Sequence, residues 1–294
     1  MNVLSLFDGM SCGQIALNKA GVKYDNYFAS EIDKYAIKIT QKNYPKTTQL
    51  GSITDIKYKE GVLYVGDKSY NVGKIDLIIG GSPCTDLSIA GKMSGLKSDD
   101  LDSYLEMKRE KVDFGGQSYL FWEYLRLMKE IKPKYFLLEN VRMSKKWKAV
   151  ITNNLGVEPI EIDSRYFSAQ KRKRLYWTNI KGIEQPHDRG INLKDILEKE
   201  DGITNPSAIR GRYINKATIV GRRINDKGHR EDYNKKIPIT QCLEVRKTNI
   251  NKSNCITTVS KDNVLTCLSP GRYIDVYGKN LPYRNYTLKE LCRL

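Results

Sequence analysis

The sequence has few of the residues that build metal centres and disulfide scaffolds. Its 294 residues include six cysteines, none of them in a C-x-x-C pair, and only two histidines, His187 and His229. Structural zinc sites and disulfide frameworks depend on closely paired cysteines and histidines. We therefore expect neither a metal ion nor a disulfide scaffold in this protein.

Apolar runs are also short. The longest, around residues 75–79, is interrupted by Asp76, whereas a membrane-spanning helix needs about 20 apolar residues. The first residues show no basic n-region, apolar h-region or cleavage site of a signal peptide. These absences predict a cytoplasmic, intracellular protein that does not cross a membrane.

Acidic residues are scarce relative to basic ones. The chain has 34 Asp and Glu against 50 Lys and Arg, a net charge of +16. Residues 205–252 carry 12 basic and 4 acidic side chains, half of this excess. A charge run is usually a solvated surface. Here it follows a change of sequence pattern near residues 182–186, so we favour a surface that faces a polyanion.

The hydrophobic pattern predicts two kinds of structure. The first 180 residues alternate short apolar runs with helical patterns, which is typical of a parallel sheet covered by helices. Expected strands cover residues 2–7, 27–30, 75–79, 135–138 and 175–177, and expected helices cover residues 14–20 and 118–131. Residues 205–252 lack a helical period and are rich in Gly, Asn, Thr and Tyr. They predict a separate small domain of short strands and loops.

Two features near the first two strands indicate a nucleoside site. The loop between the first strand and helix reads Phe7-Asp8-Gly9-Met10-Ser11-Cys12-Gly13. Glycines there let the backbone approach a ligand, and a helix N-terminus favours negative charge. Glu31 ends the second strand, where a carboxylate can accept ribose hydroxyls. Each feature alone is more typical of a structural role, but together they favour a nucleoside cofactor.

A cysteine and a carboxylate follow the next two expected strands. Cys84 comes after the turn Gly80-Gly81-Ser82-Pro83. Free cysteines are commonly small core residues, but a strand-end turn with polar neighbours favours a reactive thiolate. Glu139, at the end of the neighbouring strand, can act as an acid if its pKa is raised. Alternation places Gln170, Arg172 and Arg174 on one face, which adds positive charge.

Three motifs in this order resemble those of the DNA cytosine-5 methyltransferases. They are Gly80-Gly81-Ser82-Pro83-Cys84, Glu139-Asn140-Val141 and Gln170-x-Arg172-x-Arg174. Weaker matches are the 7–13 loop, Glu31, Leu120-Phe121 with Glu123, Cys255-Ile256-Thr257-Thr258, and Tyr286-Thr287-Leu288-Lys289-Glu290 with Arg293-Leu294. The spacing is similar to that of phage and bacterial modification methylases and of eukaryotic de novo enzymes. The resemblance runs from Val3 to Leu294, nearly the whole chain.

The resemblance implies an α/β fold: a Rossmann-like S-adenosylmethionine-dependent methyltransferase sheet with a second, smaller, mainly β or irregular target-recognition domain. Residues 1–182 would form the catalytic and cofactor-binding domain, and residues 183–283 the target-recognition domain. Residues 284–294 would begin the return to the catalytic domain.

The resemblance also implies a mechanism. A cytosine would be flipped out of double-stranded DNA, because its ring atoms are inaccessible while stacked. Cys84 would attack C6, and C5 would then take the methyl group of S-adenosylmethionine. Glu139 would bond N3 and the exocyclic amine, Arg174 would hold O2, and Arg172 would hold the loop or a phosphate. Residues 85–95 resemble a loop that closes over the base, with Gly91 and Gly95 as hinges.

For the cofactor, the resemblance assigns the methionine end to the 7–13 loop, the ribose to Glu31, the adenine face to Ile32 and the sulfonium to Leu120. The implied cofactor residues are Phe7, Asp8, Gly9, Met10, Ser11, Cys12, Gly13, Glu31, Ile32, Ser52, Ile53, Gly81, Pro83 and Leu120. Where the family usually has Gly-Asp-Ile, this chain has Gly51-Ser52-Ile53. The contact to the adenine amine is therefore expected to be weaker or to come from Asp55.

The bases of the DNA would be read mainly by side chains of the basic segment, since Arg and Lys pair with guanine and Asn or Gln with adenine. The candidate DNA-binding residues are Ser88, Lys92, Arg210, Arg222, Arg223, Gln241 and Arg246. Two alternatives stay open: a tRNA cytosine-5 methyltransferase of the same fold, and a DNA-binding subunit without turnover. Intact Cys84, Glu139 and Arg174 argue against the second.

The end of the chain carries a further expectation. Leu288, Leu291 and Leu294 are spaced as on one face of a helix, with no capping glycine after them. Family members continue past this point into a stretch with a Gly-Asn signature. We therefore expect one part of a split enzyme or a truncated product, which binds S-adenosylmethionine weakly alone and is restored by a second polypeptide.

Overall fold

The protein divides into two compact units. The computed structural model describes residues 1–84, 86–87, 95–197, 215–227, 229–245, 252–253, 264–266, 273–275 and 283–285. The first unit, here the core unit, comprises Met1–Ile162 and Lys173–Glu184, and the second, here the basic unit, comprises Asp163–Arg172 and Gln185–Leu294. The domain boundaries after residues 182 and 283 remain predictions.

A seven-stranded sheet forms the centre of the core unit, in the order β3-β2-β1-β7-β8-β10-β9. Its strands are β1 (Asn2–Leu6), β2 (Asn26–Ser30), β3 (Thr48–Gln49), β7 (Leu77–Gly80), β8 (Tyr135–Val141), β9 (Ile160–Asp163) and β10 (Lys173–Thr178). Pairings from β3 to β8 are parallel. The β8–β10 pairing is antiparallel, so the sheet is mixed and the expectation of a parallel sheet was wrong at this edge.

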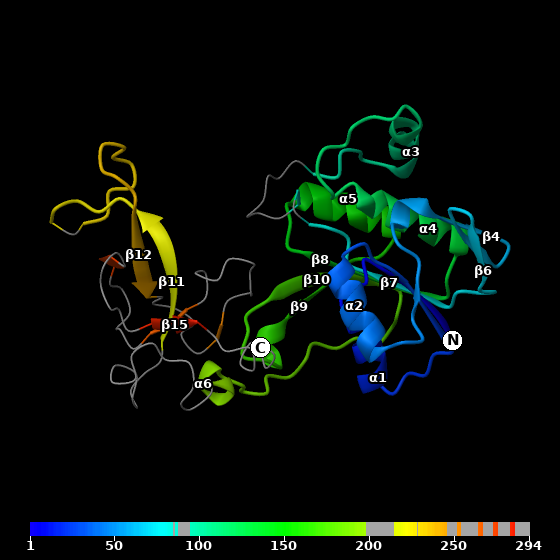
Figure 1. The fold of residues 1–294 in the computed structure, drawn as a ribbon, viewed down its shortest axis with the longest axis horizontal. Coiled ribbons are helices and arrows are strands. Elements are labelled where there is room, and N and C mark those ends of the chain that lie inside the picture. The colour runs from blue at the N-terminus through cyan, green and yellow to red at the C-terminus, as the bar shows by residue number, and fades with distance from the viewer. Residues whose placement is uncertain are drawn as a thin grey trace. The chain divides into compact units, whose positions relative to one another are not determined.

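Helices cover both faces of this sheet (Figure 1). The helices of the core unit are α1 (Cys12–Lys19), α2 (Lys34–Asn43), α3 (Leu101–Arg109), α4 (Leu120–Ile131) and α5 (Lys145–Leu155). Alternating side chains of β1 explain the two layers, since successive strand residues point to opposite faces. Leu4 and Leu6 pack in the cluster that contains α4, whereas Val3 packs in the cluster that contains Leu17 of α1.

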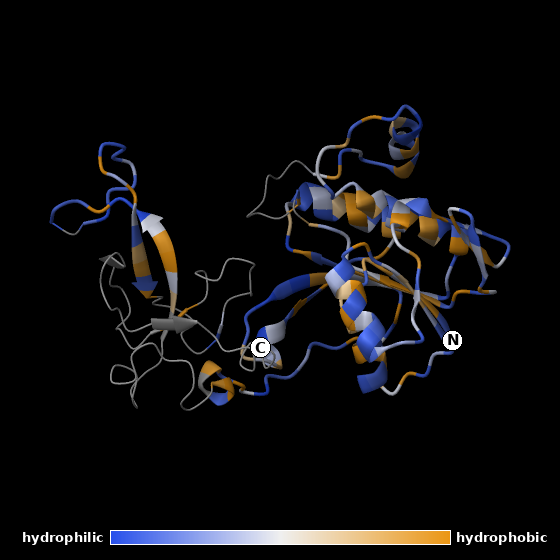
Figure 2. Ribbon diagram, viewed as in Figure 1, coloured by the Kyte–Doolittle hydropathy of each residue, from blue (hydrophilic) through white to orange (hydrophobic). Residues whose placement is uncertain are grey.

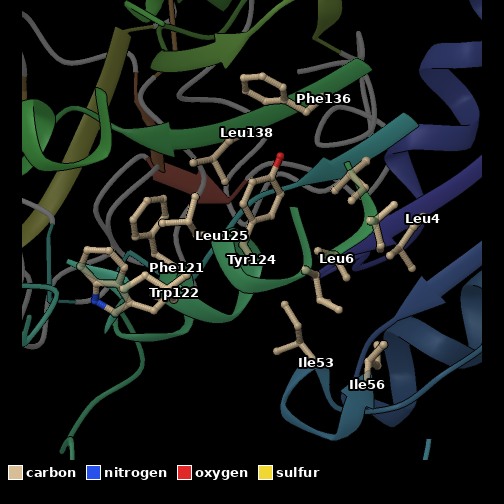
Figure 3. Packing of buried hydrophobic residues seen from close by; sticks show 14 of the residues in the cluster. Leu4, Leu6, Ile53, Ile56, Phe121, Trp122, Tyr124, Leu125, Phe136 and Leu138 are labelled. Carbon is tan, nitrogen blue, oxygen red and sulfur yellow. The ribbon is translucent and has the colours of Figure 1, made fainter. Parts of the chain in front are cut away.

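The larger cluster is built around α4, whose aromatic residues are fully buried. Figure 3 shows Tyr124 between Leu138 of β8 and Leu6 of β1, with Phe121 and Trp122 near Leu125 of the same helix. Gly80 is a glycine because a Cβ there would lie 2.9 Å from the Leu6 carbonyl and 3.0 Å from the Tyr124 ring. The helix thus fits tightly against the strand that leads to Cys84.

A small three-stranded antiparallel sheet lies within the sequence between β3 and β7. Its strands are β4 (Ile56–Lys59), β5 (Val62–Val65) and β6 (Lys68–Asn71), in that order. It follows the short 3-10 helix η1 (Ile53–Asp55). The sequence analysis did not anticipate this sheet, nor α2, α3 and α5.

The described part of the basic unit is mainly β structure, as expected. A five-stranded sheet has the order β14-β12-β11-β13-β15 and antiparallel pairings. Its strands are β11 (Asn215–Arg222), β12 (Thr240–Val245), β13 (Val264–Thr266), β14 (Tyr273–Asp275) and β15 (Tyr283–Asn285), and the unit also has η2 (Ser164–Tyr166) and α6 (Leu193–Ile196). Figure 2 shows that the loops beyond β11 and β12 are largely hydrophilic.

Several expectations concern residues that the structure does not describe. Ser88, Lys92, Arg210, Arg246 and residues 286–294 lie outside the described residues, as does most of the 85–95 loop. Among the residues that are described, no helix is long and apolar enough to cross a membrane. Within the same residues, no cluster of three metal-ligating side chains occurs.

Candidate active site

The 7–13 loop has an unusual backbone. Phe7, Gly9 and Ser11 have φ values of 59°, 58° and 64°, so alternate residues are left-handed. For Phe7 and Ser11 this conformation is costly, and such strain is concentrated at functional sites. The Gly9 N–H donates to Glu31 Oε2 at 2.8 Å, so the loop after β1 is held by the carboxylate after β2.

Asp8 is the buried carboxylate of this loop. Its Oδ1 accepts a hydrogen bond from the Tyr27 hydroxyl at 2.9 Å, while no described residue hydrogen-bonds the buried Oδ2. Burial raises the pKa of Asp8 above its ordinary value despite the bond from Tyr27. Because this oxygen is buried, a direct contact between Asp8 and a ligand remains a prediction.

Glu31 lies in a cavity at the carboxyl ends of β1 and β2. Its Oε1 accepts from the Ile32 and Asp33 N–H groups at 2.7 and 2.9 Å. A carboxylate has about four acceptor positions, so three backbone donors leave it able to accept a hydroxyl. The cavity has a volume of about 460 Å³, in the range of small-molecule sites.

The cavity gathers half of the expected cofactor residues. Its lining comprises Phe7, Ser30, Glu31, Ile32, Asp33, Ser52, Ile53, Pro83, Gln117 and Leu120. Ser30, Asp33 and Gln117 were not expected. The first two flank Glu31 and could have been inferred from its position. No sequence pattern indicated Gln117, because its place in the lining depends on how the segment before α4 packs in the folded chain.

Other residues of the 7–13 loop have different surroundings. Met10 and Cys12 line a separate cavity of about 420 Å³ beside α1 and α2. A Cβ at Gly13 would meet Ile79 Cδ1 at 2.3 Å and the Tyr27 hydroxyl at 2.5 Å. Gly13 therefore serves helix–sheet packing in this structure.

Ser52, which stands where the family usually has Asp, hydrogen-bonds within its own turn. Ser52 Oγ lies 2.7 Å from Thr54 Oγ1, and Thr54 Oγ1 donates to Asp55 Oδ1 at 3.1 Å. Ser52 and Ile53 line the cavity, whereas Asp55 is not in its lining. The suggestion that Asp55 replaces the usual acidic residue therefore receives no support from the lining.

Cys84 ends a turn that is fixed to the neighbouring strand. The side-chain amide of Asn140 donates to the Ser82 carbonyl at 3.2 Å and to Ser82 Oγ at 3.0 Å. Cys84 itself is partly exposed. Asn140 is thus a positioning residue for the turn, and its place in the Glu139-Asn140-Val141 motif is the sequence signal for it.

Glu139 and Arg174 form an ion pair beside this turn. Arg174 Nε lies 2.9 Å from Glu139 Oε1. The antiparallel register pairs Glu139 with Tyr176, which places Arg174 diagonally across on the same face. A Cβ at Gly81 would lie 3.0 Å from Glu139 Oε2. Glu139 lies inside β8 rather than after it, which corrects the expected strand end.

Arg172 and Gln170 belong to the basic unit, and Arg174 to the core unit. The strand β10 begins at Lys173, so Arg174 lies in the strand while Gln170 and Arg172 precede it. Gln170 forms a parallel bridge with Ser253, and the Arg172 N–H donates to Asp163 Oδ1 at 3.1 Å. The placement of all three residues on one face remains a prediction.

Asp86 ties the loop after Cys84 to the start of α4. Its Oδ2 accepts from the Gln117 and Ser118 N–H groups at 3.0 and 3.1 Å, and its own N–H donates to Ser118 Oγ at 3.1 Å. A Cβ at Gly116 would lie 2.4 Å from Asp86 Oδ2. Sequence reasoning missed this contact, which positions Gln117 in the lining of the cavity that contains Glu31.

Three expected DNA-binding residues lie near the ends of β11 and β12. Arg222 pairs with Glu244 at 2.7 Å. Arg223 donates to the Ile237 carbonyl. Gln241 faces Gly221 in the strand register. The arginines thus stabilise the excursion between the strands, residues 223–239, in this structure.

That excursion, here the hairpin loop, is internally cross-linked. Glu231 accepts from the side-chain amides of Asn225 and Asn234 at 2.6 and 3.0 Å. These two hydrogen bonds hold the pKa of Glu231 below its ordinary value. Tyr233 is 84% exposed and Ile239 is 60% exposed. The loop therefore presents apolar and basic side chains on a fixed backbone.

Comparison with known proteins identifies the family. The family model described as C-5 cytosine-specific DNA methylase matches residues 1–293. The chain belongs to this family. This confirms the resemblance that the motifs indicated.

Methyltransferases from two Bacillus phages are similar in sequence to this chain over part of their length. The chain is 28% identical over 215 residues to "Orphan methyltransferase M.SPRI" of Bacillus phage SPR, covering 68% of this chain and 43% of that protein. It is 29% identical over 231 residues to "Orphan methyltransferase M.SPBetaI" of Bacillus phage SPbeta, covering 68% and 50%. The chain thus spans about half the length of these relatives.

A solved structure confirms the fold class. It is described as a "putative DNA modification methyltransferase encoded within prophage" from E. coli, with a TM-score of 0.51 and 20% identity, covering 100% of this chain and 88% of that one. At this identity the likeness concerns the fold alone. It agrees with the expected α/β methyltransferase sheet.

Proposed function

We propose that this protein transfers a methyl group from S-adenosylmethionine to C5 of a flipped cytosine in double-stranded DNA. The observation that carries the proposal is the Glu139–Arg174 pair, 2.9 Å apart, beside the glycine turn that leads to Cys84. A nucleophile, a carboxyl group and a fixed cation are the groups that this reaction needs. Membership of the family supports the same assignment.

The residues divide the chemistry among them. The Cys84 thiolate attacks C6 of the cytosine and makes C5 nucleophilic. Glu139 bonds N3 and the exocyclic amine, which favours attack, and Arg174 holds both Glu139 and the O2 atom. Once C5 carries the methyl group, a water molecule or another base takes the C5 proton, and Cys84 leaves C6 as a thiolate, which restores the aromatic ring. Arg172 contacts the closing loop or a phosphate.

The cofactor cavity fits S-adenosylmethionine by the chemistry of its donors. Glu31, which lies in the lining of this cavity, suits a ribose hydroxyl. Ile32, Ile53 and Leu120 supply apolar walls for the adenine and sulfonium regions. When bound, the cofactor supplies an electrophilic methyl group.

Double-stranded DNA is the proposed partner of the basic unit. Charged loops supply affinity through phosphates, and fixed side chains supply base contacts. The hairpin loop, with Tyr233 at 84% exposure, is the described element most suited to enter a groove.

The test is covalent trapping on DNA that contains 5-fluorocytosine at the methylated site. The unmodified chain should form a stable adduct, and Cys84→Ser should form none while it still binds DNA. A matched control is Cys242→Ser, because Cys242 is buried in β12 of the basic unit. Normal methylation by Cys84→Ser, or methylation of tRNA in preference to DNA, would contradict the proposal.

A further inference from the structure

We propose that Arg126 is a positioning residue that sets the width of the cofactor cavity. It holds the segment that carries one wall at a fixed distance from α4, which carries another. The inference rests on the proposed function, because it assigns the cavity to the methyl donor.

The two walls come from different parts of the chain. Leu120, the first residue of α4, lines the cavity, and so do Ser52 and Ile53 at the start of η1. The η1 segment and β4 are separated from α4 by more than sixty residues of sequence. A contact between them is therefore needed to fix the spacing of the walls.

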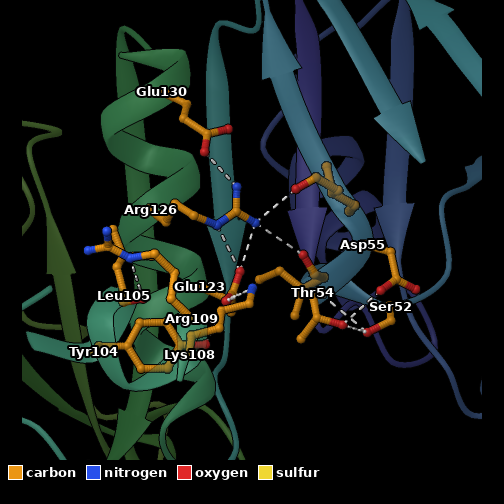
Figure 4. A network of polar contacts seen from close by, with 12 residues as sticks. Ser52, Thr54, Asp55, Tyr104, Leu105, Lys108, Arg109, Glu123, Arg126 and Glu130 are labelled. Carbon is orange, nitrogen blue, oxygen red and sulfur yellow. Dashed lines mark hydrogen bonds and ion pairs between the residues drawn. The ribbon is translucent and has the colours of Figure 1, made fainter. Parts of the chain in front are cut away.

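Arg126 makes that contact with its whole guanidinium group (Figure 4). Nη2 donates to the Ile56 carbonyl at 2.8 Å and to the Ile53 carbonyl at 3.4 Å. Nη1 donates to Glu130 Oε1 at 2.6 Å, and Nε donates to Glu123 Oε2 at 2.8 Å. The group thus connects α4 to the backbone at the first residue of η1 and at the first residue of β4.

Glu123 fixes the guanidinium in this orientation. Its side chain is fully buried and also contacts Lys108 and the Tyr104 hydroxyl. Burial would raise the pKa of Glu123, but Arg126 and Lys108 hold it below its ordinary value. The carboxylate is therefore charged at neutral pH, and its Oε2 also lies 2.7 Å from Nη2 of Arg126, the nitrogen that donates to both carbonyls.

Glu130 adds a second connection along the same helix edge. Its Oε2 accepts from the Tyr58 N–H in β4 at 3.0 Å, while its Oε1 binds Arg126. Three backbone groups of residues 53–58 are thus held by α4. Only arginine has a planar set of five donors for this pattern. Lysine has three donors, so it could not serve Glu123, Glu130 and both carbonyls together.

The test uses Arg126→Lys in the full chain, with Arg109→Lys as the matched control. Arg109 lines the same side cavity of about 530 Å³ as Arg126, and its Nε donates to the Leu105 carbonyl of its own helix. Calorimetric titration with S-adenosylhomocysteine should give a Kd about tenfold weaker for Arg126→Lys, roughly the loss of one hydrogen bond. The control should match the unmodified chain.

A role of Arg126 in overall stability alone would weaken the binding of DNA and of the cofactor product equally, so both affinities are measured. At saturating cofactor, the KM for DNA should change less than about twofold, because the missing interaction concerns the cofactor alone. An unchanged Kd for S-adenosylhomocysteine in a folded Arg126→Lys protein would overturn the proposal. So would an equal loss of affinity for DNA.

A second variant and a measurement on the unmodified chain guard against misfolding. The double variant Glu123→Gln/Arg126→Gln removes both partners of the most buried ion pair, and Lys108 and Glu130, which lose a partner, are both partly exposed. It should weaken the binding of S-adenosylhomocysteine to a similar extent. In the unmodified chain, the amides of residues 54–58 should exchange slowly even without ligand. Fast exchange that the ligand slows would overturn the proposal.

An unmodified chain that binds the product without methylating cytosine would overturn the proposed function but leave the role of Arg126 intact.

Discussion

The two units of this protein are stabilised in different ways. The core unit has a continuous apolar cluster in which α4 and the sheet strands meet, with aromatic residues fully buried. The described basic unit has only small clusters, around Ala169 and around Leu243, and relies on ion pairs and side-chain amides in its hairpin loop. Apolar burial makes the core unit a rigid frame for the proposed chemistry. The exposed charges of the basic unit suit binding to the proposed polyanion, DNA.

The two units also differ in how exposed their charged side chains are. The charges of Glu123 and Arg126 in the core unit are buried and paired, so they are costly to disrupt. In the basic unit the side chains of Lys235, Lys236 and Tyr233 are exposed. The comparison predicts that substitutions in the core unit affect turnover and stability, whereas those in the basic unit affect DNA binding.

The largest expected effect is on turnover. Glu139→Gln should lower kcat by about 10²–10⁴-fold, because the amide cannot exchange a proton with the cytosine. Glu161→Gln is the control, since Glu161 lies in the same unit and pairs with Arg142 and Lys173. The measurement is single-turnover methylation with DNA affinity followed in parallel. Activity within tenfold of the unmodified chain would contradict the assignment of Glu139.

The next effect concerns stability. Phe121→Ala should destabilise the core unit by about 3–5 kcal/mol, and Leu243→Ala should destabilise the basic unit by about 2–5 kcal/mol. We expect calorimetry to show two transitions, with each substitution lowering the Tm of its own unit. A single transition that both substitutions lower equally would break the comparison, since the units would then unfold together.

A smaller effect concerns salt. The double variant Lys235→Ala/Lys236→Ala should make the salt dependence of DNA binding shallower, by up to about 0.9 in log–log slope for each phosphate that is no longer neutralised. The same change at Lys19 and Lys23, which are exposed in the core unit, should leave the slope unchanged. The measurement is fluorescence anisotropy across a salt series. Equal slopes for the two variants would show that the hairpin loop does not neutralise phosphates.

The smallest effect is a pH trend in stability. Because burial raises the pKa of Asp8, the folded state favours the protonated acid, and the stability it contributes is lost as pH rises through that raised pKa. Asp8→Asn should therefore gain stability relative to the unmodified chain as the pH rises above the ordinary pKa of an aspartate. Asp100→Asn should show the opposite trend, because the Ser103 N–H lowers the pKa of Asp100. A pH-independent difference in Tm for Asp8→Asn would contradict this interpretation.

Much of the core unit could be predicted from local patterns. The strands at residues 2–7, 27–30 and 75–79 are apolar runs bounded by turns, and they correspond to β1, β2 and β7 within a few residues. Glu31 could be predicted as a site residue because a carboxylate after the second strand of such a sheet can accept ribose hydroxyls. The antiparallel edge at β10 was not found, because strand direction depends on pairing partners rather than on the strand's own sequence.

The sequence by itself determined the candidate chemical groups, Cys84, Glu139, Arg174 and Glu31, because their residue types and motif order are local properties. Only the tertiary structure decided that Glu139 pairs with Arg174, that Arg172 belongs to a different compact unit, and that Gln117 reaches the cofactor cavity. The role of Arg126 is of the same kind. It depends on hydrogen bonds to the carbonyls of Ile53 and Ile56, and backbone carbonyls leave no trace in residue type.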